Sequence, residues 1–471
     1  MARQFSRITK FTTAEDGAMS GGGLIFIMIF LTVGGLAVDI SNAINQRTQL
    51  QLAADAAAHT ALYVRNEELD ATPELAKAEA LTNAGRNMPG QFYGSVLTSG
   101  DIDFGVWDAA TRTFSPDPAS RTAVRVETHR DEAGENEIAT YLLKFAGVDS
   151  WNVRTAAVFE TYVPTCLREG FVAENMVDIQ SNNSYFNGFC IHSNDVVAIN
   201  SNNYFEEGTV VSMPDQSNLD LPSSGFDTNA GLQEALRYGA MQIRLINALR
   251  EVRSSPFSAG ASDMWEYIRL ATRDGQIDDI TASPLQISVV NGQPRRNDPN
   301  GNTAESNRSL QDRDNNSVLR PFAVNYVYCA SSSTQLMIQS LIKDVVIITN
   351  CQISFGSGGA MEDALLATLH TGAASISGSA STRIGKLDDC ARGGGAQLIS
   401  LGGMDFSAGV SIHGSQLIAL KEIEFAANAD GLSGTSIISG DTVSGTSNME
   451  MGLCGTGMED NLSLDYFRMV Q

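Results

Sequence analysis

The sequence predicts a protein of mixed architecture. A single N-terminal transmembrane helix extends into a long helix, followed by a small α+β domain and a β-solenoid (β-helix-like) body with a helical insertion. Three observations predict this fold class. Residues 18–40 are almost wholly apolar, residues 91–162 contain alternating apolar and polar side chains, and the chain from Cys166 repeats short apolar triplets separated by Asn, Ser and Gly. These patterns are typical of a membrane span, of half-buried strands and of stacked short strands, respectively.

The apolar run is long enough to cross a bilayer. Between Ala18 and Ile40 the only charged residue is Asp39, at the far edge. As a helix this run would span about 34 Å, compared with a bilayer core of roughly 30 Å. The apolar core of a cleaved signal peptide is shorter, about 7–15 residues. We therefore expect a retained single-pass anchor, with a cleaved signal as the alternative.

The basic residues on either side of the run predict its orientation. The first basic residue after it is Arg47, whereas three precede it: Arg3, Arg7 and Lys10. The positive-inside rule then places the N-terminus in the cytoplasm and the rest of the chain outside.

The composition limits the range of partners. The chain has 471 residues and a net charge of −23, which repels nucleic acid and, beyond the anchor, anionic lipid surfaces. We therefore expect no nucleic-acid partner. The 43 glycines, set against 12 prolines, suit turn-rich β structure rather than a disordered tail.

The helix is expected to continue beyond the span, from Ser41 to about Met88. One stripe at spacings of three or four holds mostly small residues, which would let another helix approach closely: Leu50, Ala54, Ala57, Ala61 and Val64. A second strip repeats every four residues: Asp39, Ala43, Arg47, Gln51 and Asp55. This strip is either a solvated face or a docking face for a partner helix in an envelope complex.

An ordered set of residues in this region resembles a known family. Gly17, the apolar run ending "GLAVD" at Asp39, and "RTQLQLAADAAA" at 47–58 are similar to the N-terminal segment of TadE/TadG-like proteins, over roughly residues 11–64. Those proteins are associated with assembly of Flp-type pili by the Tad secretion machinery. The resemblance implies a bacterial inner-membrane anchor, a periplasmic body, lipid around the helix and other Tad pilus-assembly proteins as partners. The corresponding docking hypothesis names four residues of the second strip: Asp39, Arg47, Gln51 and Asp55.

The next segment predicts a small α+β domain. "DIDFGVWD" alternates apolar and polar residues, and "DAATRT" turns the chain into a second strand, so the two should form a hairpin. "TAVRVETH" and "VRTAAVFETYV" alternate in the same way. Between them, "EIATYLLKFAGV" is expected to be a helix closed by Gly147.

A distant internal match supports the β-solenoid prediction. "GFCIHSNDVVAI" (188–199) and "GVSIHGSQLIAL" (409–420) align without a gap, and the alignment pairs His192 with His413. Repeated short strands with polar corners suggest stacked coils, each of which buries its apolar residues against its neighbours. Helical periodicity over 229–275 and a polar stretch over 291–317 indicate an insertion that projects from the side of the stack.

The chain has six cysteines, none in a CxxC pair: Cys166, Cys190, Cys329, Cys351, Cys390 and Cys454. All lie on the side expected to be outside the cytoplasm, where disulfides persist. Six cysteines allow 15 pairings. Local spacing favours Cys166–Cys190 and Cys329–Cys351, which leaves Cys390–Cys454.

The sequence contains no motif that predicts catalysis. HExxH, G-x-S-x-G and phosphate-binding glycine motifs are all missing. His192 and His413 are expected to be coil-corner side chains. Asp312, Asp314 and Asn316 are spaced like the start of an EF-hand loop, but Ala323 stands where a bidentate Glu would be needed. We therefore expect no catalytic residue, no cofactor and no metal site.

These observations divide the chain into seven parts: a cytoplasmic N-terminus (1–17), a transmembrane helix (18–40), a Tad-like helical stalk (41–90), an α+β periplasmic domain (91–165), a first β-solenoid part (166–218), a helical insertion with a polar loop (219–318) and a second β-solenoid part (319–471). The expected function is that of a structural, non-enzymatic component of a Tad/Flp-type pilus assembly or secretion machine. The alternatives are a membrane-tethered adhesive or carbohydrate-binding protein and a solenoid enzyme such as a lyase.

Overall fold

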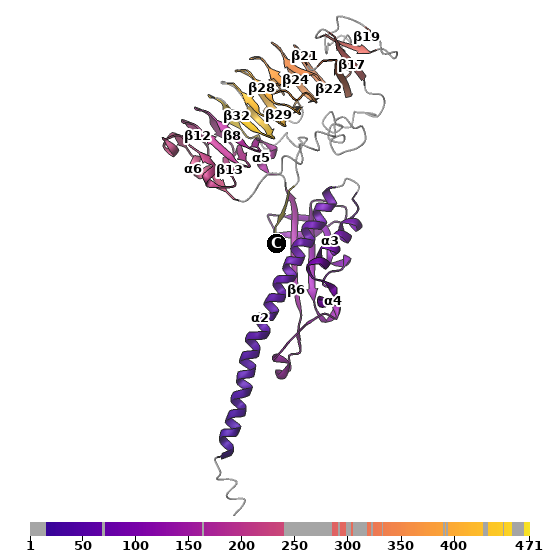
Figure 1. The fold of residues 1–471 in the computed structure, drawn as a ribbon, viewed down its shortest axis with the longest axis vertical. Coiled ribbons are helices and arrows are strands. Elements are labelled where there is room, and N and C mark those ends of the chain that lie inside the picture. Colours follow the sequence, from indigo (N-terminus) through magenta and orange to yellow (C-terminus); the bar gives the residue numbers. More distant parts are fainter. Residues whose placement is uncertain are drawn as a thin grey trace, which may run out of the picture. The chain divides into compact units, whose positions relative to one another are not determined.

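A computed structural model describes residues 16–67, 71–162, 164–239, 285–290, 293–297, 303–304, 318–321, 324–331, 333–389, 391, 394–426, 432–445, 447–454 and 466–471. The chain divides into two compact units, Met1–Tyr162 with Asp465–Gln471, and Val163–Leu464. Figure 1 shows the long helix of the first unit and the row of short strands in the second.

The first unit begins with helices α2 (Asp16–Glu67), α3 (Pro73–Asn87) and α4 (Gly90–Tyr93). The single helix expected over residues 41–88 is therefore divided. The division falls before Pro73, because proline is favoured at the first position of a helix and the Thr72 side chain caps the Leu75 N–H at 3.2 Å. The chain then turns back, so that alanines of α3 pack against those of α2: Ala76, Ala80 and Ala84.

The helices cover an antiparallel sheet of the same unit, whose strand order is β2-β1-β3-β6-β34. Its strands are β1 (Ile102–Asp108), β2 (Thr113–Pro116), β3 (Ala123–Arg130), β6 (Val153–Tyr162) and β34 (Tyr466–Met469). The expected hairpin is confirmed by the pairing of β1 with β2. The C-terminal strand β34 pairs with β6, so residues 465–471 belong to this unit. The sequence had assigned them to the second β-solenoid part.

Short elements connect these strands: η1 (Ser99–Asp101), η2 (Glu132–Gly134), η3 (Leu143–Ala146), β4 (Ile138–Ala139) and β5 (Ser150–Trp151). The prediction of a helix in "EIATYLLKFAGV" is wrong, since this segment forms the short strand β4 and the single 3-10 turn η3. The N–H groups of residues 141–143 donate to Asp39 of α2 instead. Gly147 ends the turn at φ 87°, as glycine readily does.

The second unit contains two sheets that are almost entirely parallel. Among the described residues one sheet has nine strands, in the order β14-β11-β8-β32-β30-β28-β25-β23-β21, and the other has 18. The strands of the first are β8 (Met176–Ile179), β11 (Val196–Ile199), β14 (Leu219–Asp220), β21 (Gln335–Ile338), β23 (Gln352–Phe355), β25 (Ile376–Gly378), β28 (Met404–Phe406), β30 (Ile423–Phe425) and β32 (Thr442–Gly445).

The strands of the larger sheet are β7 (Gly170–Ala173), β9 (Ser184–Phe186), β10 (Cys190–Ser193), β12 (Asn203–Phe205), β13 (Val210–Met213), β15 (Asn229–Ala230), β16 (Leu236–Tyr238), β17 (Leu285–Val290), β18 (Gln293–Asn297), β19 (Thr303–Ala304), β20 (Val324–Cys329), β22 (Leu341–Thr349), β24 (Ala360–Thr368), β26 (Arg383–Ile384), β27 (Ala396–Ser400), β29 (Ser411–Ala419), β31 (Leu432–Ser439) and β33 (Glu450–Gly452). The short helical elements of the unit are α5 (Thr165–Arg168), η4 (Gln216–Asn218), η5 (Gly225–Thr228) and α6 (Leu232–Ala235).

The order of the strands along the stack differs from their order in the sequence. From β17 the parallel pairings lead through β20, β22, β24, β27, β29 and β31, and then to β7, β10, β13 and β16. The C-terminal strands therefore precede the N-terminal ones, and β31 lies beside β7. Figure 1 shows β17 and α6 at opposite ends of this stack, with β32 beside β8.

Strands β16 and β17, which are consecutive in the described sequence, therefore lie at opposite ends of the stack. Of the helical pattern expected from residue 229, the described part forms β15, the single turn α6 and β16. Residues 240–284, where most of that pattern falls, lie outside the described residues.

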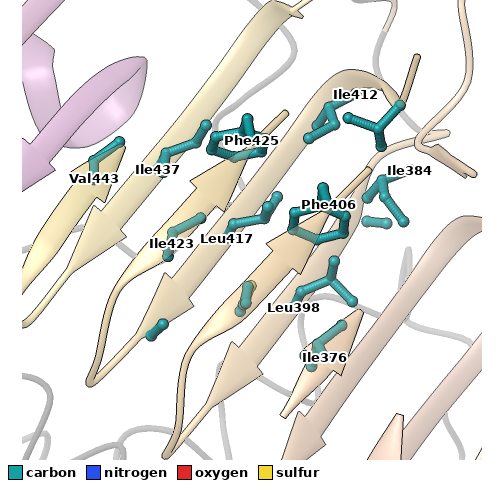
Figure 2. Packing of buried hydrophobic residues seen from close by; sticks show 14 of the residues in the cluster. Ile376, Ile384, Leu398, Phe406, Ile412, Leu417, Ile423, Phe425, Ile437 and Val443 are labelled. Carbon is teal, nitrogen blue, oxygen red and sulfur yellow. The ribbon is translucent and has the colours of Figure 1, made fainter. Parts of the chain in front are cut away.

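The stack buries one apolar core along its length. In Figure 2 the labelled side chains of β28 and β30 lie beside those of the neighbouring strands, and the Phe406 and Phe425 rings stack at 5.5 Å between centroids. Gly378 precedes them in the same column, and a Cβ there would lie 2.7 Å from the Phe406 ring. Glycine at this position therefore leaves room for the aromatic side chain.

Candidate membrane anchor and docking surface

Residues 21–33 of α2 are all exposed. The side chains from Leu24 to Phe30 are each at least 53% exposed: Leu24, Ile25, Phe26, Ile27, Met28, Ile29 and Phe30. Large apolar side chains do not cover a helix on all sides when water surrounds it. By length and composition, α2 is the one helix in the described part of the chain that could cross a membrane.

Asp39 marks the point where α2 meets the rest of its unit. Its carboxylate is 1% exposed and accepts three backbone N–H groups, from Tyr141 at 2.6 Å, Leu142 at 3.0 Å and Leu143 at 2.7 Å. One turn earlier in α2, Gly35 is also buried, and a Cβ there would lie 2.8 Å from the Leu142 Cβ. The Asp39 side chain therefore holds the η3 loop, residues 141–148, against the helix.

The other residues of the predicted docking strip differ in their surroundings. Gln51 Nε2 donates to Asp55 Oδ1 at 2.8 Å and to the Ala156 carbonyl of β6 at 3.1 Å, so both side chains are half-buried against their own domain. Arg47 is exposed. The structure thus uses Asp39 and Gln51 for contacts within the unit and leaves only Arg47 of this strip on the surface.

The small-residue stripe of α2 also packs within the chain. Leu50, Ala54, Ala57 and Ala61 are fully buried in one core with α3 and the sheet. The close helix approach that these alanines predicted is therefore made with α3 of the same molecule.

A small pocket of about 260 Å³ lies beside this core, and its charged residues form a network that the sequence did not reveal. His129 lies 3.4 Å from Asp101 and 3.5 Å from Asp131, and Arg154 Nε donates to Asp131 at 2.9 Å. The Gly134 N–H and the Arg154 guanidinium hold the pKa of Asp131 below its usual range. Among the described residues, no group of three or more His, Cys, Asp and Glu is arranged to hold a metal ion. The network joins η1, β3 and β6.

His192 and His413 do not occupy equivalent positions in the stack. The sequence alignment of 188–199 with 409–420, which paired them, is therefore not a structural alignment. His192 follows the column Val172, Ile438 and Ile418, whereas His413 lies beside Ser433. The "GFCIHSNDVVAI" segment is divided between β10 and β11 in two sheets, while most of the second copy forms the single long strand β29. The two histidines therefore do not form a stacked pair.

Both histidines are buried. Asn194 donates its amide N–H to Glu174, so its carbonyl oxygen accepts from His192 Nε2 at 3.0 Å, and Ser212 Oγ lies against Nδ1. Burial lowers the pKa of His192 and of His413 below the ordinary value of 6.5. Both side chains are therefore neutral in the folded protein at pH 7.

We expect the second unit to lose stability as the pH falls below about 6.5, because the unfolded histidines then bind protons that the folded ones do not. For each histidine the loss is at most about 1.4 kcal/mol per pH unit, and it stops growing once the pH falls below the pKa of the folded side chain. Denaturant unfolding at pH 7.5 and 5.5 measures it, and His192→Gln should reduce the difference. His59→Gln, at an exposed position of the first unit, is the control. An unchanged pH dependence in His192→Gln would contradict the prediction.

Two disulfides join neighbouring segments of the second unit, Cys166–Cys190 and Cys329–Cys351. These are the two pairings that local spacing favoured. Cys454 is also disulfide-bonded. Cys390 lies outside the described residues, as do Asp312, Asp314, Asn316 and Ala323 of the EF-hand-like segment.

The sequence did not predict the contact between Asp39 and the η3 loop, because the two segments lie more than a hundred residues apart. The only signal was an acid at the end of an otherwise uncharged apolar run. For the Asp101–His129–Asp131 network, the one feature of the sequence that could have indicated it is "HRD" at 129–131, where the predicted strand "TAVRVETH" ends.

Comparison with known proteins gives two family matches. Residues 17–65 match the model described as putative Flp pilus-assembly TadE/G-like, which agrees with the resemblance of the N-terminal segment. No curated protein matches the chain. Among solved structures, the competence-associated pilin ComZ from Thermus thermophilus is similar at 8% identity and a TM-score of 0.32, over 79% of this chain and 87% of that one. Residues 170–455 match a domain of unknown function, DUF7867, and since this match covers more than half of the sequence, the chain belongs to that family.

Proposed function

We propose that this protein is a structural, non-enzymatic component of a Tad/Flp-type pilus assembly or secretion machine, anchored in the bacterial inner membrane with its body in the periplasm. One observation carries the proposal. The TadE/G-like match over residues 17–65 coincides with helix α2, whose first third exposes large apolar side chains on all sides. The same segment therefore has both the family pattern and the surface of a membrane anchor.

Two further features support a periplasmic body. Disulfides persist in oxidising compartments such as the periplasm, and the second unit contains Cys166–Cys190 and Cys329–Cys351. The basic residues Arg3, Arg7 and Lys10 precede the apolar run, which favours a cytoplasmic N-terminus.

We also propose that the second unit is a β-solenoid. Its parallel strands pair in register with partners about 20 residues away, as in Cys190 with Val210 and Gln416 with Ser436. Such a stack presents a long continuous surface along its strands, which suits a structural role.

The docking face for another pilus-assembly protein is proposed to lie on α2, just beyond the apolar run. Ile44 and Leu52 are 61% and 62% exposed, and Thr48 and Arg47 are exposed between them. Because Asp39 and Gln51 are committed to contacts within the unit, Arg47 is the residue of the original strip that remains available. An apolar pair flanking a cation fits a partner helix with an acidic residue between apolar ones.

Reversing the charge of this face should release the partner. In Arg47→Glu/Leu52→Glu, an unpaired carboxylate at a helix interface costs several kcal/mol, so recovery of Tad assembly proteins from gently solubilised membranes should fall by tenfold or more. Ala78→Glu, at an exposed position of α3, is the matched control and should leave recovery unchanged. If the double variant is folded and abundant and still recovers the same proteins, α2 is not the docking face.

A further inference from the structure

The η3 loop, residues 141–148, places apolar side chains on the surface. Phe145 is 75% exposed, Tyr141 59% and Val148 39%, and all three lie within eight residues. Single exposed apolar residues are common on protein surfaces, but two aromatic rings at the tip of one short loop are not explained by packing within the unit.

The position of this loop along α2 indicates what covers it. Asp39 accepts the N–H groups of Tyr141, Leu142 and Leu143, and the Leu142 side chain lies against Gly35. These helix residues are at the outer end of the apolar run, which finishes at Ile40. The loop is therefore level with the last turn and a half of the proposed membrane span.

The headgroup layer of a bilayer adds roughly 5–7 Å on each side of the hydrocarbon core. Four or five residues of helix cover about 6–7 Å. Because the apolar run is about 34 Å long and the core roughly 30 Å thick, residues 35–39 of α2 and the loop fixed beside them lie at the boundary between the hydrocarbon core and the outer headgroup layer. Aromatic side chains are enriched at this level, since their rings are apolar and their edges are polar.

We propose that the η3 loop is a second membrane contact, in which Tyr141, Phe145 and Val148 lie in the outer headgroup layer of the bilayer that α2 crosses. This inference rests on the proposed anchoring of α2 in a membrane. Lys144 is exposed in the same loop, with Nζ 5.7 Å from the Phe145 ring centroid. Its ammonium group can reach lipid phosphates while its methylenes stay beside the ring.

Asp39 is the positioning residue of this contact. Three backbone N–H groups left without acceptors near hydrocarbon would be costly, and the buried carboxylate satisfies all three. This accounts for an acidic residue at the end of an otherwise uncharged run. With the loop held to the helix, the unit touches the bilayer at two points, which restricts its rotation about the axis of α2.

Spin-label accessibility in the full-length protein tests this arrangement. Nitroxides are attached at Ala146→Cys in the loop, Ile29→Cys in α2 and Ala110→Cys in the β1–β2 turn, which lies at the far end of the sheet from the loop. Labelling is done without reductant so that the natural disulfides stay closed, and the protein is reconstituted in phosphatidylethanolamine/phosphatidylglycerol vesicles. Collisions with oxygen report hydrocarbon, and collisions with a water-soluble nickel chelate report solvent.

The expected result is an oxygen-to-nickel collision ratio at residue 146 that is several-fold above that at residue 110 and clearly below that at residue 29, which lies at the middle of the apolar run. Equal ratios at 146 and 110, with a high ratio at 29, would overturn the proposed loop contact and leave the anchor intact. A low ratio at 29 would instead overturn the anchoring on which it rests.

A second variant tests the role of Asp39. In the 146-labelled protein, Asp39→Ala should release the loop, so that the ratio at 146 falls several-fold while the ratio at 29 stays unchanged. Asp39→Asn keeps a side-chain acceptor and should have a smaller effect. An unchanged ratio at 146 in Asp39→Ala would overturn the positioning role.

Discussion

Replacing Phe406 with alanine should lower the free energy of unfolding of the second unit by about 3–5 kcal/mol. Phe406 is fully buried, and its ring stacks on Phe425 at an interplanar angle of 10°. The same column continues to Gly378 and Phe355 on the other side. The cavity would lie between consecutive strands, where the parallel pairing on both sides prevents the neighbours from closing it.

The measurement is guanidinium unfolding of the full-length protein in detergent, followed by a signal from the second unit. Phe226→Ala is the matched control, because it removes the same ring from a position that is 39% exposed. A loss in Phe406→Ala no larger than in this control would mean that the aromatic column is not a main source of stability.

Asn203→Ala should cost about 2–4 kcal/mol, since it leaves buried polar groups without partners. Asn203 is 2% exposed, and its carbonyl oxygen accepts the Asn183 N–H at 2.9 Å. Its amide donates to the Asn200 carbonyl and to Asn229 Oδ1. Asn183, Asn203 and Asn229 thus form a ladder along one edge of the stack, in which each side chain satisfies the backbone of the preceding coil.

Asn200→Ala provides the comparison for this prediction, because Asn200 lies on an exposed corner of the same coil. Unfolding of both variants under the same conditions separates the buried ladder from the general cost of replacing asparagine. Equal losses in the two variants would contradict a special contribution from the ladder.

The sequence predicted local features of this fold better than distant ones. The apolar run and the β1–β2 hairpin follow from short-range patterns, so helix α2 and the pairing of β1 with β2 could be anticipated. The division of the helix before Pro73 was also signalled locally, but the continuous alanine pattern on both sides obscured it. The register of the stack could not be predicted, because each coil is defined by its neighbours and not by its own pattern.

The repeat between 188–199 and 409–420 illustrates this limit. Apolar residues two positions apart suit a strand in either sheet. The similar sequences therefore form two strands, β10 and β11, at 188–199 and one long strand, β29, at 409–420. The candidate site shows the same limit. The charge and position of Asp39 favoured a docking role. Its partners are instead the backbone N–H groups of residues 141–143. Nothing near Asp39 in the sequence identifies these partners.

The adjacency of β31 and β7 has a consequence for biogenesis. Asn175 donates to Asp441 across 266 positions of sequence. Residues 436–439 of β31 pair with residues 170–173 of β7, and this pairing joins the two halves of the stack. During synthesis, β7 is made early, and its pairing partner β31 is made only near the end of the chain. Closure over such a distance is slow, and until it occurs the edge of β7 remains a template for pairing with other chains. A chain truncated before residue 432 would lack β31, β32 and β33, and would therefore leave the edges of β7, β8 and β9 unpaired.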